Sequence, residues 1–168
     1  MAGVKQLSNF ALCMLRVGGH ITLTTVEHEY QARKMEVVFD DAAYAAHIRA
    51  LFTPKEAKKA GSMGAWVEWE KAKHEGQGHG SPRWTKKALK QEWKEMIQQR
   101  WIPVSAKIMR ELLLQKFNPN VNQDLWAFLD STGERPLHEV GRPNFWTKAG
   151  QDMLGRLLLD VRHEWQIR

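Results

Sequence analysis

The sequence predicts a single, mainly α-helical domain with a short β-hairpin near its N-terminus. The chain has 168 residues, of which 43 % are hydrophobic, and this length and composition suit one domain around one sizeable core. Two short apolar runs, Leu12 to Val17 and His20 to Leu23, flank Gly18-Gly19, a pattern typical of a tight hairpin. Beyond the hairpin, apolar residues recur at helical spacing, and we expect about six or seven helices.

The helix that follows the hairpin presents one polar face. Thr24 can cap it, and Glu27 comes three residues later, which is the spacing of a capping box. Tyr30, Gln31 and Lys34 share the face of Glu27, with Lys34 about 10 Å further along the axis. A carboxylate, a phenol, an amide and an amine on one face suit proton transfer or attack by an amine on a polar substrate. The alternative is that Glu27 only caps its own helix and Lys34 points into water.

Start and stop signals place the remaining helices. Thr53-Pro54-Lys55-Glu56 combines a cap, a proline in the first turn and a glutamate at the third position, and Gly61 ends that helix. Residues 62 to 100 are less regular, and Thr85 can cap a helix in their second half. Pro103 breaks the next helical pattern, so Ser105 is expected to cap a new helix. The signals together predict helices that begin near Asp41, Thr53, Thr85, Ser105 and Asp124, and a last helix from about Gly150 to Trp165.

The charge is positive and unevenly distributed. The formal net charge is +6, and residues 62–100 contain eight Lys or Arg against five Asp or Glu, so half of the excess lies in this segment. A basic balance favours polyanionic partners or phosphorylated substrates. The segment 62–100 is therefore a candidate for contact with nucleic-acid phosphates, and the alternative is an ordinary solvated face.

Several classes of protein are disfavoured. The sequence has no run of 18 apolar residues, so no membrane segment is expected. The lone Cys13 leaves no internal disulfide and fits a cytoplasmic location. His74 and His79 have no accompanying cysteines, and neither a phosphate-binding loop nor a nucleophilic serine motif is present, so we expect no metal and no cofactor. Acid–base chemistry on a glycosidic or phosphate-linked substrate remains, as does binding without catalysis.

Motifs along most of the chain resemble the NADAR/YbiA-like family. No single motif is decisive, but their order and spacing together are specific. The matching segments are Ser8-Asn9-Phe10, Thr25 to Lys34, Thr53-Pro54 with Ala57 and Gly61, Trp101 with Met109 and Lys116-Phe117, Thr132-Gly133 with Leu137 and Glu139, Phe145-Trp146, and Met153 to Leu158 with Arg162. The resemblance implies one NADAR-like domain over residues 1–168 with a YbiA-like helical fold. Residues 62–100 look like a basic insertion in it.

The resemblance implies an N-glycosidase. Some members of the family cleave phosphorylated ribosylamine intermediates of the riboflavin pathway. Others remove ADP-ribose from guanine, including guanine in DNA modified by DarT-type toxins, and some phages use such a protein against that defence. The basic segment favours ADP-ribosylated guanine in nucleic acid as substrate. The alternatives are a small phosphorylated ribosylamine, or an ADP-ribose or nucleotide-binding module that does not turn over.

The resemblance also suggests roles for individual residues. It implies that Glu27 is the catalytic carboxylate, that Trp101 stacks near the base or ribose, and that Lys34 attacks C1′ of the ribose to form a transient imine. Such a lysine needs a depressed pKa, for which we expect burial beside tryptophan rings, opposed by Glu27. The expected substrate-binding residues are Asn9, Phe10, Tyr30, Gln31, Trp146 and Arg156. The glycine- and aspartate-rich loop that follows Phe-Trp in the family looks shortened here, after Trp146.

Overall fold

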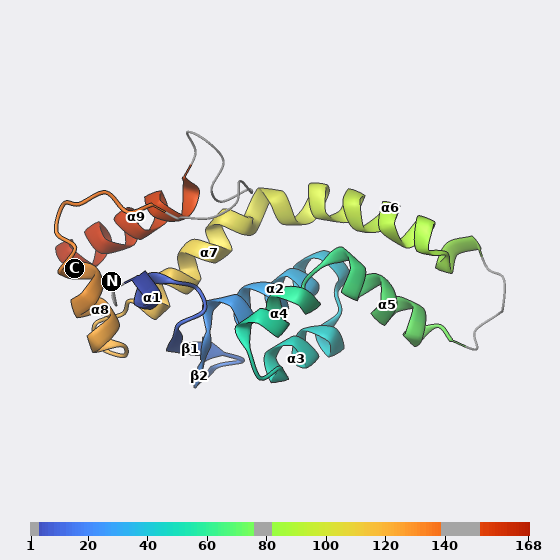
Figure 1. The fold of residues 1–168 in the computed structure, drawn as a ribbon, viewed down its shortest axis with the longest axis horizontal. Coiled ribbons are helices and arrows are strands. Elements are labelled where there is room, and N and C mark those ends of the chain that lie inside the picture. The colour runs from blue at the N-terminus through green and yellow to red at the C-terminus, as the bar shows by residue number, and fades with distance from the viewer. Residues whose placement is uncertain (1–3, 76–81, 139–151) are drawn as a thin grey trace. The chain divides into compact units, whose positions relative to one another are not determined.

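A computed structural model describes residues 4–75, 82–138 and 152–168 (Figure 1). Helices dominate these residues, with one antiparallel hairpin near the N-terminus, so the predicted mainly α class is confirmed. The elements are α1 (Val4–Leu7), β1 (Leu12–Val17), β2 (His20–Thr25), α2 (Val26–Phe39), α3 (Ala42–Ala50), α4 (Pro54–Ala60), α5 (Met63–Lys73), η1 (Pro82–Trp84), α6 (Lys86–Met96), η2 (Ile97–Trp101), α7 (Ile102–Lys116), α8 (Gln123–Asp130) and α9 (Met153–Ile167). Among the described residues, no helix has the length and apolarity needed to cross a membrane.

The chain divides into two compact units. The terminal unit combines Met1–Val26 with Ala106–Arg168, and the central unit is Glu27–Ser105. The prediction of one domain over residues 1–168, with an insertion at about 62–100, stays a prediction.

The hairpin of the terminal unit follows from its two glycines. Gly18 and Gly19 have φ of 55° and 88°, and a tight turn with two positive φ values matches the right-handed twist of the strands that it joins. Leu12 pairs with Thr25 and Val17 with His20, which confirms the predicted hairpin.

Amide side chains satisfy the other edge of β1. The Oδ1 of Asn122 accepts from the Met14 N–H at 2.8 Å, and its Nδ2 donates to the Met14 carbonyl at 2.9 Å. The Oε1 of Gln115 accepts from the Arg16 N–H at 2.8 Å. A two-stranded sheet leaves backbone groups unpaired at both edges, so these side chains take the place of a third strand.

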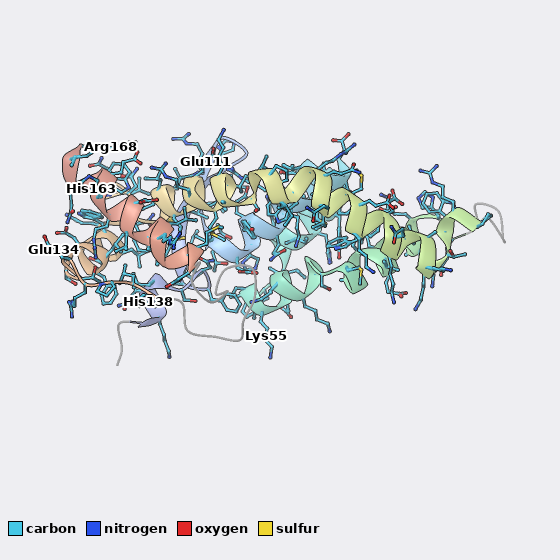
Figure 2. The ribbon with its side chains drawn as sticks, turned by 90° about the horizontal axis from the view of Figure 1, so that it is seen from above. Lys55, Glu111, Glu134, His138, His163 and Arg168 are labelled. Carbon is cyan, nitrogen blue, oxygen red and sulfur yellow. The ribbon has the colours of Figure 1, made fainter. Side chains whose placement is uncertain are left out.

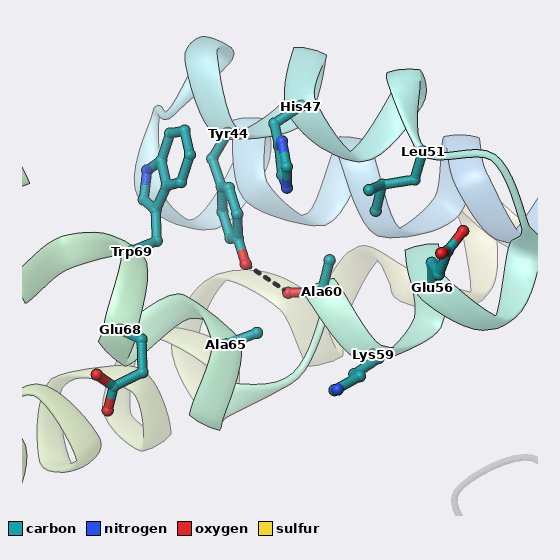
Figure 3. Close-up of a pocket in the computed structure, with 9 residues that line it drawn as sticks. All are labelled: Tyr44, His47, Leu51, Glu56, Lys59, Ala60, Ala65, Glu68 and Trp69. Carbon is teal, nitrogen blue, oxygen red and sulfur yellow. Dashed lines mark hydrogen bonds between the residues drawn. The ribbon is translucent and has the colours of Figure 1, made fainter. Parts of the chain in front are cut away.

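Three helices of the central unit begin at the expected caps, whereas Thr24, the expected cap of α2, lies in β2 and pairs with Cys13. The Thr53 hydroxyl accepts from the Glu56 N–H, and the Glu56 carboxylate accepts from the Thr53 N–H at 2.8 Å, so the predicted capping box is present. Thr85 caps α6 and Asp41 caps α3, also as predicted. Figure 2 shows Lys55 extending outward from α4. The hydroxyl of Tyr44 donates to the Ala60 carbonyl at 2.8 Å and ties α3 to the end of α4 (Figure 3).

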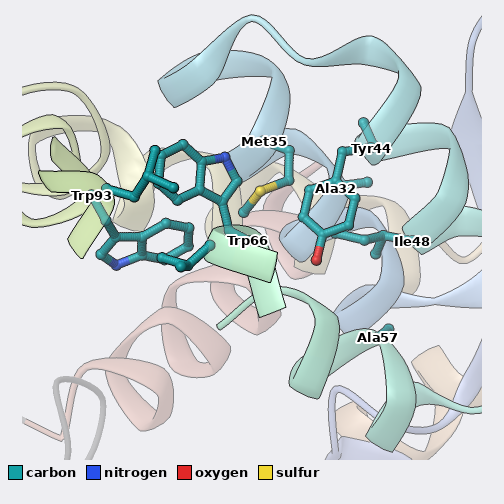
Figure 4. Close-up of a cluster of buried hydrophobic side chains, with 10 residues drawn as sticks. Ala32, Met35, Tyr44, Ile48, Ala57, Trp66 and Trp93 are labelled. Carbon is teal, nitrogen blue, oxygen red and sulfur yellow. The ribbon is translucent and has the colours of Figure 1, made fainter. Parts of the chain in front are cut away.

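An aromatic core fills the central unit (Figure 4). Phe39 stacks on Trp66 with ring centroids 4.3 Å apart and on Trp93 at 5.1 Å. Met35 is fully buried in the same cluster. Trp66 belongs to α5, for which the less regular sequence after Gly61 gave no signal. Long-range packing against α2 and α6 therefore supports a helix that local patterning did not predict.

The predicted break at Pro103 is wrong. The chain continues from α6 through the π-helical turn η2 into α7, and Pro103 is the second residue of α7. A π turn locally rearranges the backbone hydrogen bonds, so a proline that lacks an N–H is tolerated there. Ser105 is not a cap: it is buried within α7, where its hydroxyl donates to the Ile102 carbonyl at 3.2 Å.

Candidate active site

Glu27 and Gln31 form a buried polar pair on α2. Their side chains lie one turn apart, and the Nε2 of Gln31 donates to the Oε1 of Glu27 at 2.9 Å. The two residues are only 6 % and 8 % exposed. The bond orients the carboxylate, and burial keeps water from competing for it. A carboxylate held in this way is suited to exchange a proton with a bound substrate.

Lys34 is buried on the same helix, so the interpretation that it points into water is wrong. Its Nζ donates to the Gly61 carbonyl at 2.5 Å and lies 5.6 Å from the centroid of the Trp93 ring. Burial lowers the pKa of the Lys34 amine from 10.5 to about 8, while the charge of Glu27 acts in the opposite direction. A larger fraction of this amine is therefore neutral near physiological pH, as a nucleophilic lysine requires.

Tyr30 and Trp101 pack edge to face. Their ring centroids are 4.8 Å apart with an interplanar angle of 61°, a favourable arrangement for two aromatic rings. Burial raises the pKa of the Tyr30 phenol, although hydrogen bonds to Ser105 and Trp101 lower it; Glu27 also raises it. The phenol therefore stays protonated. Trp101 is only 6 % exposed, because the protein itself covers its ring. A role in stacking on a substrate base therefore stays a prediction.

We expect Trp101→Ala to destabilise the protein by about 3–5 kcal/mol, because a buried ring that packs on Tyr30 is lost. Trp101→Phe keeps an aromatic partner for Tyr30 and should lose less than half as much. Urea unfolding measures both changes. If a base stacks on Trp101, the folded Trp101→Ala protein should also bind ADP-ribose about 1–3 kcal/mol more weakly. An unfolding midpoint that Trp101→Ala leaves unchanged would contradict a packing role.

Gly61 lies between the side chains of Lys34 and Gln31. Its φ of −70° suits any residue, so backbone conformation does not require glycine here. A Cβ at this position, however, would come within 3.0 Å of three side-chain atoms of Gln31, and it would overlap the Oε1. That Oε1 is buried and has no hydrogen-bond partner among the described residues. Gly61 thus accepts the bond from Lys34 and leaves room for Gln31.

We expect Gly61→Ala to destabilise the protein by about 1–3 kcal/mol through overpacking against Gln31. Gln31→Ala removes the obstructing atoms, so the double variant should be more stable than the sum of the two single changes by about 0.5–3 kcal/mol. Unfolding free energies of the four proteins give this coupling. Gly64→Ala is the control, because nothing lies within 4 Å of a Cβ at Gly64. Additive effects of Gly61→Ala and Gln31→Ala would show that the close approach does not matter.

An ion-pair network holds α2 against α3. Glu29 is 3 % exposed, and its carboxylate accepts from Arg33 Nε at 3.1 Å and from Arg49 Nε at 2.8 Å. Arg49 also donates to Glu36 at 2.6 Å. These contacts tie α2 to α3. The sequence motif contains Glu29 and Arg33, but nothing in it reveals Arg49, the second partner of Glu29.

The other predicted site residues lie outside the central unit or outside the described residues. Asn9 and Phe10 precede β1, and Arg156 is exposed on α9, all in the terminal unit. The Nδ2 of Asn9 lies 3.6 Å from the Met109 sulfur. Trp146 and the shortened loop after it lie outside the described residues. The structure therefore brings together Glu27, Gln31 and Lys34, and Tyr30 with Trp101.

The central unit also has a pocket of about 400 Å³ (Figure 3). The ring of Tyr44 stacks on Trp69 with centroids 4.5 Å apart, and the His47 ring lies 5.8 Å from Tyr44 and 5.4 Å from Trp69. The lining residues are Tyr44, His47, Leu51, Glu56, Lys59, Ala60, Ala65, Glu68 and Trp69. None of the predicted site residues is among them, so the candidate active site rests on the buried cluster around Glu27 and Lys34 and not on this pocket.

The chain belongs to the NADAR family: the NADAR domain matches residues 3–166. The E. coli protein YbiA, whose structure was determined by NMR, is similar to it with a TM-score of 0.61 and 25 % sequence identity, over 96 % of this chain and 78 % of that one. No curated protein matches the chain. The resemblance and the YbiA-like fold predicted from the sequence are confirmed, and at the level of the family they support an N-glycosidase-type hydrolase.

Proposed function

We propose that this protein is an N-glycosidase that removes ADP-ribose from guanine in nucleic acid. The observation that carries the proposal is the buried amine of Lys34, whose pKa is lowered to about 8, seven residues along α2 from the buried carboxylate of Glu27. A nucleophile and a proton-exchanging group on one helix can together cleave a ribosyl C–N bond. The excess of basic residues in 62–100 favours a nucleic-acid substrate over a small one.

In the proposed reaction, the neutral amine of Lys34 forms a bond to C1′ of the ribose while the bond from C1′ to the guanine nitrogen breaks. Glu27 accepts a proton from the attacking amine and passes it to the leaving guanine. The ribose ring then opens at the C1′–O4′ bond as O4′ takes a proton from solvent, which leaves a protonated imine between C1′ and Lys34. Water adds to this imine, one proton returns to solvent, and the neutral lysine leaves as C1′ becomes an aldehyde on which O4′ recloses the ring. The sum is ADP-ribosyl-guanine plus water giving ADP-ribose plus guanine.

The other groups of the cluster have supporting parts in this scheme. Gln31 holds the carboxylate of Glu27 through its Nε2, and its Oε1, which has no partner among the described residues, can accept a hydrogen bond. Tyr30 offers a protonated hydroxyl close to Glu27, and Trp101 offers an aromatic edge. Together they make a polar, largely dry setting in which a developing positive charge on the ribose is stabilised by the carboxylate.

Mass spectrometry of a guanine-ADP-ribosylated oligonucleotide, before and after incubation with the protein, tests the proposal. We expect the mass of the ADP-ribosyl group to disappear from the oligonucleotide and free ADP-ribose to appear. A phosphorylated ribosylamino-pyrimidine is incubated in parallel. Turnover of that compound alone would identify the small-substrate activity instead, and ADP-ribose binding without turnover of either substrate would identify a binding module.

A further inference from the structure

Three exposed lysines lie on one face of α6 (Lys86–Met96). Leu89 and Trp93 are buried on the inner side of this helix, and Lys87, Lys90 and Lys94 are exposed. Lys94 lies about 20° around the helix from Lys87 and about 10 Å further along the axis. Lys90 lies between them along the axis, within roughly 60° of each around the helix. Three amines therefore form a narrow row on the surface of the central unit, which we call the α6 lysine row.

These charges are not neutralised within the described part of the chain. Lys86, at the start of the same helix, has an ion pair with Glu68 at 2.8 Å, but no described carboxylate pairs with Lys87, Lys90 or Lys94. Lys87 and Lys90 are three positions apart and Lys90 and Lys94 are four, which are spacings at which like charges on a helix repel each other. An anionic ligand that runs along the helix would remove this repulsion.

The carboxylates of α6 itself do not interrupt the row. Glu92 lies about 140° around the helix from Lys87, and Glu95 about 80°. Glu95 also accepts a hydrogen bond from Gln91 at 2.6 Å. The row therefore presents a single sign of charge over about 10 Å of helix, instead of the mixed charges of an ordinary solvated face.

We propose that Lys87, Lys90 and Lys94 hold the sugar–phosphate backbone of a nucleic-acid substrate. This rests on the proposed function, because it assigns to that substrate a contact away from the reacting base. Phosphates recur about every 3.4 Å along each strand of a duplex, so a row of about 10 Å faces three of them. Lysines are flexible point charges that suit phosphate contacts without reading the base sequence.

Fluorescence anisotropy with an unmodified oligonucleotide tests the α6 lysine row directly. The row variant is Lys87→Gln/Lys90→Gln/Lys94→Gln. The control is Lys55→Gln/Lys58→Gln/Lys59→Gln on α4, which removes the same net charge from exposed lysines of the same unit. In the row variant, the slope of log affinity against log salt should fall by about 2 for a single strand and about 3 for a duplex. The control should keep the slope of the natural protein. Circular dichroism verifies that both variants are folded.

The small substrate separates this contact from the chemistry. The row variant should hydrolyse ADP-ribosylated guanosine with the kcat and KM of the natural protein, while its KM for the modified oligonucleotide rises at least tenfold. If the natural protein hydrolyses neither substrate, the proposed function fails and the anisotropy result still decides the phosphate contact. An unchanged salt slope in the row variant, or the same loss in both variants, overturns the inference. The inference is also overturned if the row variant binds the oligonucleotide as the natural protein does and loses binding only to vesicles that contain phosphatidylserine.

Discussion

We expect Glu27→Gln to lower kcat by about 100-fold or more, because an amide cannot exchange the proton that a carboxylate exchanges. The substitution keeps the size of the side chain, and an amide oxygen can still accept the bond that Gln31 donates to Glu27 at 2.9 Å. The geometry of the cluster should therefore survive. Turnover of the ADP-ribosylated oligonucleotide at saturating substrate measures the loss.

Glu29→Gln is the matched control for this experiment. Glu29 is on the same helix and is also buried, but its carboxylate pairs with Arg33 and Arg49. Removing one charge of a buried ion pair should destabilise the protein and leave kcat of the folded enzyme within a few-fold of the original. A Glu27→Gln enzyme that turns over normally, with only the roughly 1 kcal/mol loss of stability expected for a helix cap, would defeat the catalytic assignment.

Lys34→Arg should abolish both turnover and covalent trapping. The guanidinium keeps the positive charge but is never neutral near physiological pH, so it cannot attack C1′. Treatment of the original enzyme with substrate and borohydride should reduce the imine and add the sugar-containing fragment to the peptide that contains Lys34. Mass spectrometry of the digested protein locates the adduct. Lys34→Met, which has a similar length and no nitrogen, excludes an effect of the larger arginine.

Lys116 is an internal control for the trapping experiment. It is fully buried in the terminal unit, its Nζ donates to the Ser8 carbonyl at 2.6 Å, and burial likewise lowers its pKa to about 8. A lowered pKa alone would modify both lysines, whereas catalysis should modify only Lys34. If Lys34→Arg is active and no adduct forms, then Lys34 pairs with a substrate phosphate and is not the nucleophile.

The pH dependence follows from the same amine. Because Lys34 has a pKa of about 8 and attacks only when neutral, kcat should rise as the pH is raised through about 8 and level off above it. Lys34→Arg should remove this rise along with the activity. The pH series is measured on the original enzyme and needs no variant. If kcat does not change between pH 7 and 9, then Lys34 does not titrate in the rate-limiting step.

The sequence by itself determined the features that depend on near neighbours in the chain. The two glycines at positive φ define the hairpin, Thr53 and Glu56 define the start of α4, and the polar face of α2 follows from helical periodicity. The motifs along the chain also indicated the family. For the hairpin, the cap and the helix face, residues within a few positions of one another carry the whole signal, since these features are built from local hydrogen bonds and steric limits.

The tertiary structure alone decided the surroundings of these residues. The sequence left two interpretations of Lys34, exposure to water and burial beside tryptophan rings, and the structure decided between them. Gly61, 27 positions away, and Trp93 enclose the amine, and its lowered pKa is a consequence of that burial. The sequence predicted only that Gly61 ends a helix, whereas in the structure its missing side chain also makes room for Gln31. The break expected at Pro103 did not occur, because the π-helical turn before it carries the helix onward. Burial and close approach depend on residues that are distant in sequence, so no local pattern reveals them.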